Sequence, residues 1–191
     1  MYRTILFLLS ALLIGACSTQ AQSPPSAEEQ IAAAVKAAPA SMRDAATVLG
    51  YDNNMELTTL REGNGTLVCL ASDPADDTFH ASCYHSALEP FMKRGRELRR
   101  QGHSGAAVDS IRRAEIEDGT LSYPERPTAL YNLSGDAYDA AADSVQNASR
   151  LRVLYVPYAT AETTGLPTQP QGGPWLMAPG EPWAHVMMTG S

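Results

Sequence analysis

One segment, Arg150–Val156, constrains the fold of this chain more than any other. Its residues are Arg-Leu-Arg-Val-Leu-Tyr-Val, and Pro157 follows directly. Charged and apolar side chains alternate in the first half, whereas the second half is apolar at consecutive positions, as in a strand covered on both faces. Proline has no backbone N–H to donate and ends the segment. The sequence therefore predicts a sheet in which this strand is central.

Other strand-like segments lie on both sides of a helical region. Glu56–Arg61 and Thr66–Ala71 flank Asn64-Gly65, a pair that tolerates the positive φ of a tight turn, which predicts a hairpin. The further predicted elements are a helix ending before Pro39, helices Ser86–Gln101 and Ala106–Asp118 (with Val108, Ile111 and Ala114 facing inward), and strands Ala129–Leu133, Trp175–Met177 and Ala184–Met188. This order predicts the α+β class: a mixed or mainly antiparallel sheet with helices packed on one face.

The N-terminus has the pattern of a secretory signal peptide. Arg3 precedes an apolar run from Ile5 to Leu13, and small residues follow up to Ala16. The run is too short to be a membrane span. Ile14-Gly15-Ala16-Cys17 resembles the lipobox of bacterial lipoproteins, which implies cleavage before Cys17 and lipidation of that cysteine. The alternative is an ordinary signal peptide cleaved near Ala21.

The lipobox reading divides the chain into three parts. Residues 1–16 are the signal peptide, residues 17–25 are the lipidated cysteine with a polar, proline-containing tether, and residues 26–191 are one globular domain. Ser18, rather than aspartate, follows the cysteine, which resembles the sorting signal of outer-membrane lipoproteins. We therefore expect the cell envelope as the location, with an outer-membrane anchor and the domain facing the periplasm or the cell surface.

Charge limits the classes of partner. The chain carries 14 basic and 21 acidic side chains, and cleavage before Cys17 removes only Arg3. An acidic surface argues against nucleic acid, because phosphate binding needs clustered positive charge. The acyl groups on Cys17 would hold the protein on the membrane. No cofactor is expected.

Two internal cysteines, Cys69 and Cys83, remain after the lipidated one. An oxidising envelope compartment favours a disulfide between them. The alternative is a metal site, because His80, Cys83 and His85 lie within six residues of one another and Cys69 could supply a fourth ligand. That spacing matches no standard zinc motif, so we expect the disulfide and no metal.

Gly102-His103-Ser104-Gly105-Ala106 is similar to the Gly-x-Ser-x-Gly nucleophile elbow of α/β-hydrolases. His185 follows later in the chain, as that family's order of catalytic residues requires, with Asp136 or Asp143 between. The residues before Gly102 form a charged helix rather than the apolar strand that an elbow needs. A small serine hydrolase using Ser104 and His185 is therefore the alternative, and we expect no enzyme activity.

Basic residues crowd the first of the two central helices. Lys93, Arg94, Arg96, Arg99 and Arg100 fall within eight residues of an otherwise acidic chain. Such a patch predicts an anionic envelope component or an acidic protein face as partner. The alternative is that these residues pair with neighbouring glutamates and favour the helix C-terminus through its dipole.

Several sequence blocks look like those of an uncharacterised group of exported bacterial proteins. They are Arg61–Gly65 with Cys69-Leu70, Ile111–Ile116, Pro124–Pro127 and Pro182–Met187. The resemblance implies one domain and carries no activity or site residues. From the sequence we expect an envelope lipoprotein whose domain is a binding or structural module.

Overall fold

Eight strands form one sheet in the computed structural model, which describes residues 23–190 of the chain. The strand order is β2-β1-β3-β4-β5-β8-β10-β9, and only the β1–β3 pair is parallel. The strands are β1 (Thr47–Tyr51), β2 (Leu57–Arg61), β3 (Leu67–Leu70), β4 (Phe79–His85), β5 (Thr128–Gly135), β8 (Ser149–Tyr155), β9 (Trp175–Met177) and β10 (His185–Gly190). β6 (Tyr138–Asp139) and β7 (Ser144–Val145) form a separate small hairpin. The predicted signal peptide and Cys17 lie outside the described residues.

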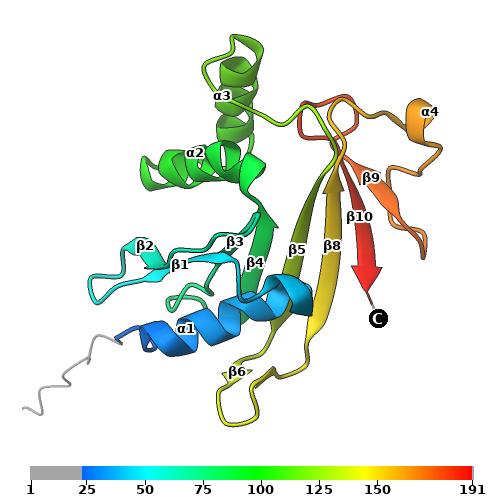
Figure 1. Cartoon of the computed structure of the whole chain (residues 1–191). Coiled ribbons are helices and arrows are strands. Elements are labelled where there is room, and N and C mark those ends of the chain that lie inside the picture. Colours follow the sequence, from blue (N-terminus) through cyan, green and yellow to red (C-terminus); the bar gives the residue numbers. More distant parts are fainter. Residues whose placement is uncertain (1–22, 191) are drawn as a thin grey trace, which may run out of the picture.

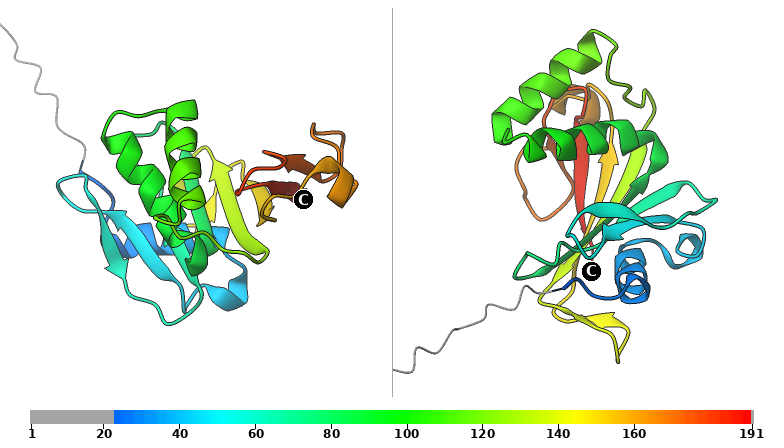
Figure 2. Two further views of the ribbon diagram at one scale, coloured as in Figure 1. Left: turned by 90° about the horizontal axis from the view of Figure 1, so that it is seen from above. Right: turned by 90° about the vertical axis from the view of Figure 1, so that its left-hand side faces the viewer.

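Helices connect the strands and cover parts of the sheet (Figures 1 and 2). The α-helices are α1 (Ala27–Ala34), α2 (Glu89–Arg100), α3 (Gly105–Glu117) and α4 (Ala161–Thr164), and the 3-10 helices are η1 (Val35–Ala37), η2 (Ala40–Met42) and η3 (Ser86–Leu88). The predicted α+β class with a mixed sheet is confirmed, and β8 lies inside the sheet between β5 and β10. Within residues 23–190, no helix is long and apolar enough to cross a membrane.

The two faces of the sheet have different coverings. On one face, α1 and η1 pack on alternate residues of β1, β3 and β4, including Val48, Cys69 and Ala81. On the other face, Leu88 of η3 and Met92 of α2 pack with Val153 of β8. Figure 1 shows that α1 lies beside the β1–β4 half, whereas α2 and α3 lie over one end of the sheet. The helices therefore do not share one face, and on the α1 face the part of the sheet around β5 and β8 is approached by η1 and η2 rather than by an α-helix.

The predicted hairpin between Glu56–Arg61 and Thr66–Ala71 is wrong. Both segments are strands, but β1 lies between them and pairs with each. Gly63 permits this arrangement, because a Cβ there would lie 2.3 Å from the carbonyl oxygen of Ala45, next to the start of β1. The connection that contains Asn64-Gly65 therefore passes the start of β1 and links two strands that lie on opposite sides of β1, not two neighbouring strands.

The predicted inner face of α3 is partly wrong. Val108 is buried, as predicted, but Ala114 is exposed, and Arg112 is buried in its place. The Arg112 guanidinium lies 3.8 Å from the Phe91 ring centroid and pairs with Asp109 at 2.8 Å. An aromatic surface can accept a stacked arginine, which periodicity of apolar residues does not reveal.

Candidate anion-binding site

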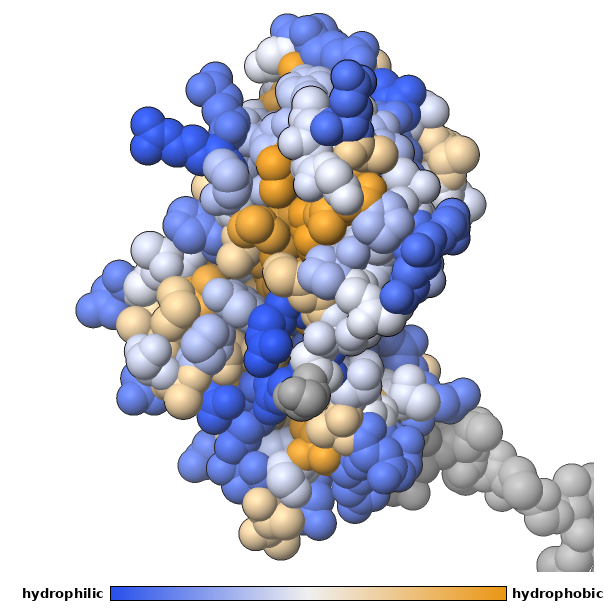
Figure 3. Space-filling view, turned by 90° about the vertical axis from the view of Figure 1, so that its right-hand side faces the viewer, coloured by the Kyte–Doolittle hydropathy of each residue, from blue (hydrophilic) through white to orange (hydrophobic). Residues whose placement is uncertain are grey.

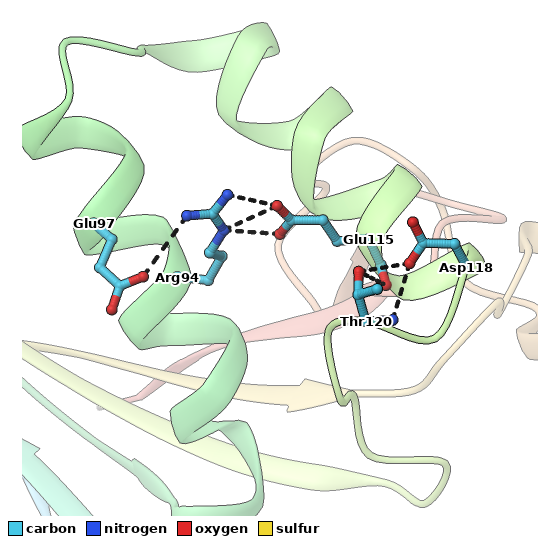
Figure 4. Close-up of polar contacts among 5 residues, drawn as sticks. All are labelled: Arg94, Glu97, Glu115, Asp118 and Thr120. Carbon is cyan, nitrogen blue, oxygen red and sulfur yellow. Dashed lines mark hydrogen bonds and ion pairs between the residues drawn. The ribbon is translucent and has the colours of Figure 1, made fainter.

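Two arginines of the predicted basic patch, Arg94 and Arg96, form ion pairs with glutamates of the same domain. Arg94 of α2 binds Glu115 of α3 through both of its carboxylate oxygens, at 2.5–3.0 Å, and lies 3.7 Å from Glu97. Figure 4 shows this guanidinium between the two carboxylates. Hydrogen bonding to Glu115 raises the pKa of Arg94. Arg94 therefore joins α2 to α3.

The other four basic residues of α2 divide into two groups. Arg96 donates to Glu89 at 2.7 Å and to the Tyr84 hydroxyl at 3.0 Å. Burial raises the pKa of Tyr84. Lys93, Arg99 and Arg100 are exposed and form no ion pair with residues 23–190. A patch of three free cations thus remains from the predicted five, and its role in binding stays a prediction.

The residues of the alternative hydrolase site lie in unrelated surroundings. Ser104 is exposed at the N-cap of α3, where its hydroxyl forms no hydrogen bond with residues 23–190. The Nδ1–H of His185 donates to the carbonyl of Trp183 at 2.8 Å, and its ring packs against Tyr155. Burial lowers the pKa of His185. No hydrogen bond in the described chain joins this histidine to a serine.

The cysteines and histidines of β3 and β4 do not gather as metal ligands. Cys69 and Cys83 lie opposite each other in register and form the predicted disulfide. Side chains alternate along a strand, so His80 lies on the opposite face of β4 from Cys83. His85 accepts a hydrogen bond from the N–H of Ala87. No group of three or more potential metal ligands occurs within residues 23–190.

A different cluster of cations lies on the α1 face of the sheet, between η1–η2 and the strands β5 and β8. Arg150 and Arg152 are two residues apart on β8, so both project from this face, roughly 6–7 Å apart along the strand. Arg43, directly after η2, lies on the opposite wall of the same pocket. The three arginines line one pocket of about 340 Å³ between η1–η2 and the strands β5 and β8, and no aspartate or glutamate belongs to its wall.

Backbone carbonyls hold two of these arginines in place. Arg43 donates to the carbonyls of Ala38 and Lys36, at 3.1 and 3.4 Å, and Arg150 donates to the same Lys36 carbonyl at 3.0 Å. Arg152 is exposed, and its guanidinium lies against Gly190 of β10, where a Cβ would come within 3.0 Å of Nη1. Residues 23–190 supply none of the three with a carboxylate partner.

The arrangement is suited to bind an anion. A guanidinium has five N–H donors in a planar fork that matches carboxylate and phosphate oxygens. Carbonyl bonds occupy only some of the donors on Arg43 and Arg150, and they restrict the side chains without neutralising the charge. Three positive charges around one cavity without a carboxylate create a local positive potential in an acidic protein. The pocket therefore offers an anion both charge and unused hydrogen-bond donors.

A larger groove continues from this pocket along the same face. It has a volume of about 720 Å³ and shares Tyr131 with the arginine pocket. Ala129 and Leu154, which are neighbours across β5 and β8, form its floor beside Tyr131 and Arg152. The rest of its wall is Met42, Leu67, His85, Ala87 and the segment 124–128.

Sequence reasoning missed this site, although one signal was present. Arg150 and Arg152 occupy alternate positions of the segment predicted to be a central strand, which places two charges on one face of a sheet. Arg43 lies more than 100 residues earlier in the chain, and only the tertiary fold brings it to the same cavity.

Comparison with known proteins adds no relative. The chain matches no protein-family model, and searches of curated proteins and of solved structures find no similar protein.

Proposed function

We propose that this chain is an exported cell-envelope lipoprotein whose domain is a binding module for an anionic ligand. The observation that carries the binding role is the convergence of Arg43, Arg150 and Arg152 on one pocket without a carboxylate in its wall. The export role rests on the signal-peptide pattern and on Cys17. The disulfide between Cys69 and Cys83 is consistent with it, because such bonds persist in oxidising compartments.

The binding role is tested with a chain that starts at Ser18. This chain retains the whole sheet, the disulfide and all four hydrophobic clusters of residues 23–190. Inorganic phosphate and acetate are titrated while amide and arginine Nε–H signals are followed by NMR. We expect shifts confined to residues around the pocket, with binding weakened tenfold or more by the double substitution Arg150→Gln and Arg152→Gln.

A matched control removes the same charge elsewhere. Arg99→Gln with Arg100→Gln neutralises two exposed cations of α2 and leaves the pocket intact. This variant should bind both anions as the unmodified chain does. Equal weakening by the two double variants would indicate a general charge effect and contradict the pocket, whereas loss only with the α2 variant would move the site to the basic helix.

The anchor is tested separately in cells. Radiolabelled palmitate should label the full chain, and Cys17→Ala should abolish the label, because lipidation requires the thiol of this residue. Labelling that survives the substitution, or no labelling of the unmodified chain, would contradict the lipoprotein assignment without affecting the binding test.

A further inference from the structure

We infer that the ligand is a single-chain amphiphile, with an anionic head in the arginine pocket and an alkyl chain in the adjoining groove. This inference rests on the proposed anion-binding function and specifies its ligand class. A fatty acid and an alkyl or acyl phosphate share this chemistry. The juxtaposition that carries it is a cavity with three guanidinium groups and no carboxylate in its wall, next to a mainly apolar groove on the same face of the sheet.

Strand register makes the two cavities one continuous surface. Arg150, Arg152 and Leu154 are alternate residues of β8, so they follow one another along the same face. Beside them on β5, Tyr131 pairs with Arg152 and Ala129 pairs with Leu154. The face therefore changes from cationic to apolar within two residues of strand, and Tyr131 stands at the boundary.

The composition of the groove fits an alkyl chain. Eight of its twelve wall residues are apolar or aromatic: Met42, Leu67, Ala87, Pro124, Pro127, Ala129, Tyr131 and Leu154. Its charged wall residues, Glu125 and Arg126, are exposed in the segment before β5. The volume of about 720 Å³ falls in the range of small-ligand sites. A purely polar anion would leave this apolar surface uncovered.

The surface has the same contrast on a larger scale. Figure 3 views the molecule from the side of β9 and β10, where hydrophobic side chains gather in the middle and strongly hydrophilic ones lie directly below them. Around this end of the sheet, Leu154 of β8, Val156 directly after β8 and Val186 of β10 are only partly buried. Because an exposed apolar surface adjoins a cationic pocket, the two together favour a ligand that joins an alkyl chain to an anionic group.

The test compares ligands that differ in one property at a time. Octanoate, decanoate and dodecanoate, each below the concentration at which it forms micelles, are titrated into the chain starting at Ser18 by calorimetry. Affinity should increase by up to about fourfold for each added methylene, the limit for complete burial. Dodecyl phosphate should also bind. Comparing its affinity with that of dodecanoate shows whether the pocket prefers a phosphate or a carboxylate head group. Dodecyltrimethylammonium, with the same chain and a cationic head, should not bind.

Two substitutions separate head from chain. Arg152→Gln should weaken binding of dodecanoate and of acetate alike by about tenfold, and the Arg152 side chain forms no hydrogen bond within residues 23–190. Leu154→Asn should remove most of the gain between octanoate and dodecanoate while acetate binding stays unchanged. Arg99→Gln with Arg100→Gln serves as the matched charge control.

The outcomes distinguish the two proposals. If acetate and phosphate bind at the pocket and chain length has no effect, the amphiphile inference is overturned and the anion-binding function stands. If dodecyltrimethylammonium binds as tightly as dodecanoate, the site is a nonspecific apolar surface and the inference is again overturned. If neither short nor long anions bind, both proposals fail.

Discussion

At the residue scale, His185 links the stability of the domain to pH. Burial lowers the pKa of its imidazole below the ordinary value of 6.5, although the hydrogen bond to Trp183 partly opposes the shift. The unfolded chain therefore binds a proton more readily than the folded one. The stability that neutral His185 provides is fully present above pH 6.5 and is lost as the pH falls below it.

We predict that the free energy of unfolding decreases between pH 7.5 and pH 5 and that His185→Gln makes this decrease smaller. Urea unfolding at several pH values measures it, in a range where carboxylates with ordinary pKa values stay largely ionised. The same substitution at the exposed His103 is the control for replacing a histidine by glutamine. A dependence identical in the His185 variant and the unmodified chain would remove this histidine as its source.

The disulfide is a second feature at this scale. Cys69 and Cys83 are fully buried, opposite each other in β3 and β4, and separated by 14 residues in sequence. Closing a loop of this size restricts the unfolded chain and contributes about 3 kcal/mol by the chain-entropy model. Reduction, measured by urea unfolding with and without reductant, should lower stability by about that amount. Two thiols that alkylate in the unreduced, denatured protein would show that the bond is absent.

At the element scale, one side chain attaches α1 to the sheet. Gln30 is 4% exposed; its amide donates to the carbonyls of Pro25 and Tyr51, and its oxygen accepts from the Tyr51 N–H. Gly50 makes room, because a Cβ there would lie 2.6 Å from the Gln30 oxygen. The Gln30 amide thus forms with Tyr51 of β1 the same pair of N–H and carbonyl hydrogen bonds that a neighbouring strand would form.

Gln30→Ala should therefore destabilise the domain by about 1–3 kcal/mol, since the buried backbone groups of Tyr51 lose their partner. Equilibrium urea unfolding measures the loss. Gln101→Ala, at an exposed position after α2, is the matched control and should cost less than about 0.5 kcal/mol. If both variants are equally stable, the Gln30 bonds contribute nothing net.

The elements that the sequence predicts well are those whose own pattern decides them. β8 ends before Pro157, and α2 and α3 begin and end within a few residues of the predicted limits. β1 and β4 were not predicted because contacts with distant residues determine them: Gly50 of β1 makes room for Gln30, and His80 and Cys83, considered as metal ligands, point to opposite faces of β4. The arginine pocket combines η2 with β8, so no local pattern could predict it.

At the scale of the whole molecule, one sheet connects every part of the fold. In the spatial order β2-β1-β3-β4-β5-β8-β10-β9, each strand is hydrogen-bonded to the next. β8 thereby joins the half of the sheet that α1 covers to β10 and β9. The β9–β10 end has its own small cluster around Leu176, which shares no buried residue with the cluster under α1. Continuous strand pairing favours one cooperative unit, whereas separate clusters would allow the C-terminal end to unfold first.

We predict a single transition, because β10 pairs with β8 over six residues and Met187 packs in the cluster that includes Tyr84 and Leu88. Trp175 lies in β9, and Trp183, just before β10, packs against Phe91 of α2. Their fluorescence therefore reports on the C-terminal part and its contact with α2, while far-ultraviolet circular dichroism reports on the whole sheet. The two signals should give the same urea midpoint. A fluorescence change at lower urea would show that β9 and β10 unfold independently; the groove, whose floor is β5 and β8, would then survive that first step.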